Sequence, residues 1–141
     1  MSKVAVVYWS GTGNTQTMAD AVTAGAQAAG AEVQVFGPAE FSADKVAEFD
    51  GLAFGCPAMG SEVLEEGEFD PMFTAVEGAL SGKKVGLFGS YGWGDGAWMR
   101  DWEDRVRADG AVLVSDGVIA NGAPDGDALS SLDELGKAVA A

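Results

Sequence analysis

Residues 4–15 read Val4-Ala5-Val6-Val7-Tyr8-Trp9-Ser10-Gly11-Thr12-Gly13-Asn14-Thr15. An apolar run of strand character ends here in a loop of hydroxyl residues, glycines and an asparagine. Beyond the loop, small and apolar side chains recur at helical spacing, so the loop is expected to open a helix. The free amides at that helix start, together with the hydroxyls and the asparagine amide, predict a phosphate site.

The loop contains no lysine. Nucleotide triphosphatases with the pattern GxxxxGK[ST] need that cation against several charged phosphates. A loop that offers only hydroxyls and amides is better suited to one phosphomonoester, and this is the ligand group we expect.

Apolar, strand-like runs alternate with helical patterns along the whole chain. Such alternation predicts an α/β fold with a parallel sheet. With right-handed crossovers, five strands in the order 2-1-3-4-5 place the ligand site at the switch point between strands one and three. The expected strands cover residues 4–9, 33–36, 52–55, 85–89, and 112–114 together with 118–120.

Helices are expected after Thr15, from Asp70-Pro71, around Trp98 and after Pro124, with at most a short one capped by Ser42. Aspartate as the N-cap and proline in the first turn mark the second of these. The inward faces are predicted to carry Phe73, Val76, Leu80, Trp98, Trp102, Val106, Leu132, Leu135, Gly136 and Val139.

The chain has 141 residues, 48% of them hydrophobic, and a formal net charge of −14. This length suffices for one buried core, so we expect one domain covering residues 1–141. The negative charge repels nucleic acid and anionic membrane surfaces and favours basic protein partners.

The six apolar residues after Lys3 are too few for a signal peptide or a membrane span, so a cytoplasmic protein is expected. Cys56 is the only cysteine and there is no histidine. An internal disulfide and histidine-based acid–base catalysis are therefore excluded, and no metal site is expected. Cys56 itself is interpreted as a small buried hydrophobe without chemistry.

Two further loops, 55–62 and 89–96, follow buried strands and are expected beside the phosphate loop. Trp93, flanked by glycines, and Met59, a soft thioether, could enclose a flat ring between them. A planar ring with a phosphomonoester tail indicates flavin mononucleotide (FMN).

Three motifs occur in order along the chain: YWSGTGNT at 8–15, AMGSE at 58–62 and LFGSYGWGD at 87–95. Together they resemble the motifs of short-chain flavodoxins, and the resemblance runs through essentially the whole chain. It implies a flavodoxin-like three-layer αβα sandwich with noncovalent FMN. It also implies an electron carrier with no substrate or catalytic residues of its own. Its FMN is expected to cycle at low potential through a neutral semiquinone and an anionic hydroquinone.

The resemblance also implies roles for single residues. Ser10, Thr12, Asn14 and Thr15, with the amides of Gly11 and Gly13, would hold the phosphate. Met59 and Trp93 would bracket the ring, while Glu62 would accept the flavin N3–H. The backbone of Ser90, Tyr91 and Gly92 would approach the pyrimidine side, and Asn121 the ribityl chain or ring edge. The other cofactor-binding residues expected in these loops are Pro57, Ala58, Gly60, Ser61 and Gly94.

Two features are expected to tune the flavin. The turn 59–62 would change conformation on reduction, so that the Gly60 carbonyl accepts a hydrogen bond from flavin N5–H, as the resemblance implies. A ring of carboxylates would disfavour the anionic hydroquinone and dock basic-surfaced redox enzymes. Its members are Glu62, Glu65, Glu66, Glu68, Asp70 and Asp95.

Two other interpretations remain open at this point. An FMN-dependent quinone or nitro-compound reductase of related fold would need a substrate pocket over the ring and usually a dimer, whereas a monomer is expected here. A phosphoacceptor signalling domain would need acidic residues at the ends of strands one and three, where this chain has Trp9-Ser10 and Gly55-Cys56.

Overall fold

The computed structural model describes residues 2–11, 13–59, 63–92 and 94–141. The chain alternates strands and helices as the apolar patterns predict. In order the elements are β1 Lys3–Tyr8, α1 Asn14–Ala28, β2 Glu32–Phe36, a 3-10 turn Pro38–Glu40, α2 Ala43–Val46, β3 Gly51–Gly55, α3 Phe69–Val76, a 3-10 turn Glu77–Ala79, β4 Lys84–Tyr91, α4 Ala97–Ala108, β5 Val112–Leu113, β6 Val118–Asn121 and α5 Gly126–Ala140.

The strands form one parallel sheet in the order β2-β1-β3-β4-β5, which confirms the predicted fold class and topology. The fifth position is divided between two short strands. β5 pairs with Lys84 and Val85 at the start of β4, and β6 pairs with residues 88–91 at its end. The order reverses between β1 and β3, so their carboxyl ends define the crevice where open α/β sheets bind ligands.

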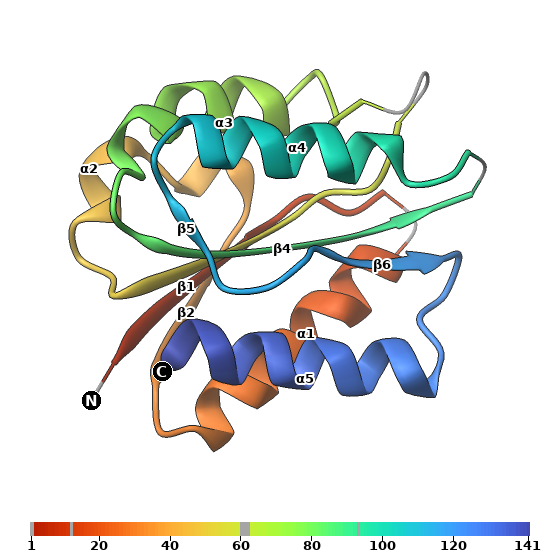
Figure 1. Cartoon of the computed structure of the whole chain (residues 1–141), viewed down its shortest axis with the longest axis horizontal. Coiled ribbons are helices and arrows are strands. Elements are labelled where there is room, and N and C mark those ends of the chain that lie inside the picture. The colour runs from red at the N-terminus through yellow and green to blue at the C-terminus, as the bar shows by residue number, and fades with distance from the viewer. Residues whose placement is uncertain (1, 12, 60–62, 93) are drawn as a thin grey trace.

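Two layers of helices cover the sheet (Figure 1). α1 and α5 lie on one face, over a core that includes Val6, Met18 and Leu132. α3 and α4 lie on the other, over a core that includes Phe54 and Trp102. The residues predicted for the inward faces are buried in these two cores, which establishes the three-layer sandwich.

The predicted start of α3 is wrong in detail. The helix begins at Phe69 with Glu68 as N-cap, so Asp70 lies inside the first turn and caps nothing. The physical reason is that the Glu65 carboxylate already accepts the amide hydrogen atoms of Gly67, Glu68 and Phe69 at 2.7–2.8 Å. Ser42 does precede α2, but its hydroxyl bonds the Asp44 carboxylate rather than a helix amide.

Candidate functional site

The loop after β1 has the geometry of an anion site. Gly13 adopts φ +95°, a conformation that favours glycine, and α1 begins at the next residue, Asn14. Ser10 Oγ accepts hydrogen bonds from the amides of Gly13 at 3.1 Å and Gln16 at 3.4 Å. Because Ser10 accepts in these bonds, its hydroxyl proton is left to donate. The N-terminus of α1 and this hydroxyl together suit a phosphate group.

Thr15 connects this loop to the other side of the site. It is buried, and its Oγ1 lies 3.3 Å from the Oγ of Ser90, which is buried at the end of β4. One hydroxyl donates to the other, so one proton of the pair is available to a ligand. The contact joins the first turn of α1 to the strand whose carboxyl end carries the third predicted loop.

A cavity of about 250 Å³ lies at the carboxyl edge of the sheet, where the three predicted loops meet. The Ala58 amide donates to the Ser90 carbonyl at 2.9 Å, which continues the pairing of β3 with β4 into this wall. The aromatic and aliphatic walls suit a planar ring, and the α1 terminus at one end suits its phosphate. The lining residues are Trp9, Gly11, Asn14, Pro57, Ala58, Met59, Ser90, Tyr91, Gly92 and Gly122.

Some predicted site residues do not line this cavity. Ser10, Gly13, Thr15 and Gly94 lie outside its lining, and Asn121 is an exposed residue at the end of β6. The predictions for Thr12, Gly60, Ser61, Glu62 and Trp93 concern positions outside the described residues.

Sequence reasoning missed two lining residues, Trp9 and Gly122. Trp9 directly precedes the phosphate loop, and its ring lies 3.0 Å from where a side chain at Gly11 would begin. Its position next to the loop was a usable signal. Gly122 reaches the site because its amide donates to the Tyr91 carbonyl at 2.8 Å, a contact between segments far apart in sequence.

A larger hollow of about 650 Å³ lies between residues 115–119 and α5. Its walls include Asp116, Asp125, Asp127 and Glu134. Four carboxylates repel a phosphate, and the hollow lies away from the crevice between β1 and β3. The smaller, mostly apolar cavity is therefore the better fit to a planar ring with a phosphate tail.

The carboxylates expected around the ring occupy unequal environments. Burial opposes ionisation of Glu65, but the amides of Phe69, Glu68 and Gly67 outweigh it and lower its pKa. Asp70 pairs with Arg105 at 2.9 Å and Asp95 with Arg100 at 3.1 Å. These three carboxylates therefore each have a local partner within the structure, in addition to their place among the predicted acidic residues. Glu66 and Glu68 are exposed.

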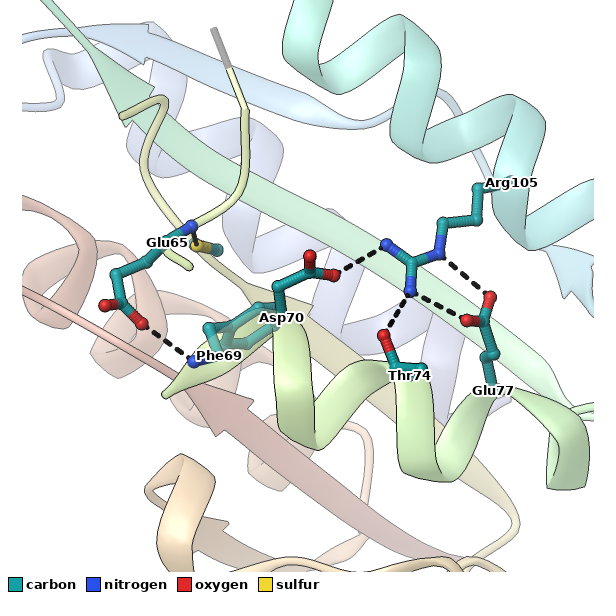
Figure 2. Close-up of polar contacts among 7 residues, drawn as sticks. Glu65, Phe69, Asp70, Thr74, Glu77 and Arg105 are labelled. Atoms are coloured by element: carbon teal, nitrogen blue, oxygen red, sulfur yellow. Dashed lines mark hydrogen bonds and ion pairs between the residues drawn. The ribbon is translucent and has the colours of Figure 1, made fainter. Parts of the chain in front are cut away.

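Arg105 joins α4 to α3 and to the 3-10 turn that follows it (Figure 2). Its guanidinium donates to both carboxylate oxygens of Glu77, at 2.9 and 2.7 Å, and to Thr74 Oγ1 at 3.0 Å, besides its bond to Asp70. Its plane also lies over Phe73. The bond from Arg105 lowers the pKa of Glu77 against the opposing effect of burial. A forked, multiply bonded arginine holds two helices in a fixed relation.

Asp109 follows α4 and lies beside Glu77 and Arg105. Its Oδ2 is buried without a hydrogen-bond partner among the described residues. Burial, and then the neighbouring Glu77 carboxylate, raise the pKa of Asp109 to about 6. The folded protein thus holds this proton more tightly than the unfolded chain, and ionisation of Asp109 costs stability as the pH rises through about 6.

Asp109→Asn is expected to raise the free energy of unfolding at pH 7.5 by up to about 1 kcal/mol, a value reduced for solvent screening. The gain should disappear near pH 4, where wild-type Asp109 is protonated. Urea unfolding across this pH range measures the difference. Asp104→Asn, which removes only an exposed pair with Arg107, is the control. A gain for Asp109→Asn that does not depend on pH would contradict the assignment.

Comparison with known proteins agrees with this geometry. The sequence model described as Flavodoxin matches residues 6–134. The chain is 46% identical to a flavodoxin of Clostridium beijerinckii, covering 96% of this chain and 97% of that protein. The solution structure of two-electron reduced Megasphaera elsdenii flavodoxin superimposes with a TM-score of 0.90 at 47% identity, covering 97% of this chain and 98% of that one.

A doubly wound sheet with an apolar cavity and a phosphate loop at its switch point defines a protein that binds a planar, phosphate-tailed cofactor. The chain belongs to the flavodoxin family. Membership gives it FMN as cofactor and electron transfer between redox enzymes as its role, without a substrate reaction of its own.

Among the described residues, no helix is both long and apolar enough to cross a bilayer. Within the same part of the chain, no group of three or more histidine, cysteine, aspartate or glutamate side chains is arranged to hold a metal ion.

Proposed function

We propose that this chain is a low-potential carrier of one or two electrons that acts as a monomer in the cytoplasm. Bound FMN supplies the redox chemistry and passes through a neutral semiquinone and an anionic hydroquinone. The protein sets the relative free energies of these states. The observation that carries the proposal is the cavity formed by the three loops, which places apolar walls beside an anion-binding helix start.

The three loops have separate roles in this proposal. Ser10, Thr15 and the Gly11 amide hold the phosphate, with Asn14 on the cavity wall. The Gly13 amide, predicted to bind the phosphate directly, donates to Ser10 Oγ and orients that hydroxyl. Pro57, Ala58 and Met59 form one side of the ring site, and the 90–92 backbone forms the pyrimidine side. Met59 is 36% exposed, so it can both cover the ring and contact a partner. Trp93 and the 60–62 turn would complete the enclosure.

Basic-surfaced oxidoreductases are the proposed partners. The chain carries a net charge of −14, and Glu66 and Glu68 are exposed on the loop leading into α3. Complementary charge steers partners to the protein and makes the association rate depend on salt.

Glu66→Gln with Glu68→Gln is expected to raise the potential for the second electron by roughly 20–90 mV at low salt. Two carboxylates in water-like surroundings each disfavour a further negative charge by a few tenths of a kcal/mol up to about 1 kcal/mol. Spectroelectrochemical titration measures the shift, which should shrink in high salt. Glu65 stays unchanged in this variant because its carboxylate caps the loop.

The matched control is Glu32→Gln with Glu48→Gln. Glu32 begins β2 and Glu48 lies shortly before β3, so both sit at the amino edge of the sheet, opposite the cavity. The control should shift the potential by much less than the Glu66/Glu68 variant, since the Coulomb interaction falls with distance and these two carboxylates lie at the opposite edge of the sheet. Equal shifts in both double variants would count against a local effect.

A further inference from the structure

Two sets of hydrogen bonds connect the two sides of the segment between β3 and α3. Met59 and Val63 exchange backbone hydrogen bonds of 2.9 and 3.0 Å. Nearer to β3 and α3, the Glu65 amide donates to Cys56 Sγ at 3.3 Å. The residues that line the cavity from this side, Pro57, Ala58 and Met59, therefore lie within a loop whose two ends are tied together.

The Glu65 end is fixed to α3. Its carboxylate accepts from the amides of Gly67, Glu68 and Phe69, and its carbonyl accepts the Asp70 amide at 2.9 Å. Figure 2 shows the carboxylate directed at Phe69, whose ring is fully buried. The backbone and the side chain of Glu65 are thus both hydrogen-bonded to the first residues of α3 and the residues just before it.

The Cys56 end is fixed to β4 and α4. Its amide donates to the Phe88 carbonyl at 3.1 Å, and its carbonyl accepts the Trp98 indole N–H at 3.2 Å. A side chain at Gly89 would begin 2.1 Å from that carbonyl, so only glycine permits this close approach. Burial raises the pKa of Cys56 to about 12, and the thiol stays neutral.

We propose that Cys56 and Glu65 are positioning residues for the flavin, although neither lines the cavity. Their sulfur–amide hydrogen bond, held between α3 on one side and β4 with α4 on the other, fixes the wall of residues 57–59 before FMN arrives. A preformed wall avoids the cost of ordering the loop on binding. This inference rests on the proposed function: Cys56 and Glu65 would preorganise the 57–59 wall of the FMN site.

The first test changes no charge. Cys56→Ala removes the sulfur acceptor and is expected to weaken FMN binding about three- to tenfold, the usual effect of one lost hydrogen bond. Cys56→Ser keeps an acceptor and should recover most of the affinity. In the apoprotein, hydrogen exchange at the Glu65 amide should quicken in Cys56→Ala while exchange at Val6 in the core stays unchanged.

The second test separates positioning from electrostatics by the direction in which FMN affinity changes. Removing a negative charge near a phosphate-bearing ligand should tighten FMN binding, and Glu66→Gln, the adjacent exposed control, should do so slightly. Glu65→Gln removes the same charge but leaves at least one of three amides without an acceptor. The proposal predicts that it weakens FMN binding about threefold or more.

The outcomes are distinct. If Glu65→Gln tightens FMN binding as much as Glu66→Gln, or if Cys56→Ala binds like wild type with unchanged Glu65 exchange, the positioning role is wrong. If wild-type protein itself binds no FMN, the proposed function fails instead.

Discussion

Asn14→Asp is expected to weaken FMN binding by about 30-fold or more while leaving riboflavin binding within about twofold of wild type. Asn14 lines the cavity as the first residue of α1. A new carboxylate about 4 Å from a doubly charged phosphate costs about 2 kcal/mol even at the dielectric constant of water, and more in a sheltered site. Riboflavin lacks the phosphate, so the added charge should have little effect on it.

Flavin fluorescence titration of the apoprotein with both ligands measures this difference. Gln16→Glu is the matched control, because it adds the same charge two residues later at an exposed position. It should weaken FMN binding by much less than Asn14→Asp does. Equal losses of FMN and riboflavin affinity in Asn14→Asp would show that the variant damages the site generally, and would contradict the assignment of the phosphate to this helix start.

Gly136→Val is expected to lower the free energy of unfolding by at least about 3 kcal/mol. α1 and α5 pack side by side under the sheet (Figure 1), and a side chain at Gly136 would begin 2.1 Å from the Val22 carbonyl. A side chain at Gly25 in α1 would likewise begin 2.1 Å from the Asp133 carbonyl of α5. Backbone cannot move aside as a flexible side chain could, so the helices must separate.

Gly126→Ala provides the control in the same helix, since a side chain there meets nothing within 4 Å and the backbone is not left-handed. It should leave stability unchanged or raise it by up to about 1 kcal/mol. Chemical denaturation measures both variants. A Gly136→Val protein as stable as wild type would mean that the two helices are not held this close.

Local patterns predicted the fold well. The strand runs, the helical faces with Trp98, Trp102 and Val106, and the sheet order are all found in the structure, because burial periodicity and right-handed crossovers leave few alternatives. The end of β4 was predicted at Gly89, but the strand continues to Tyr91 because β6 pairs with it. That pairing joins segments far apart in the chain.

The site was predictable in its loops but less so in its individual roles. Asp70 has the residue type of an N-cap, yet Glu65 takes the amides before α3 begins, and Asp70 is left to Arg105. Gly122 lines the cavity through a backbone bond to Tyr91 that no local pattern signals. Such assignments depend on which groups tertiary packing brings within hydrogen-bond distance.

FMN binding and its redox behaviour in this protein are tested by an absorption spectrum recorded while the purified protein, mixed with one equivalent of FMN, is reduced stepwise. We expect a yellow complex that passes through a blue neutral semiquinone and then bleaches to the hydroquinone. FMN that stays unbound after filtration, or a complex that bleaches in one step with no blue species, would contradict it.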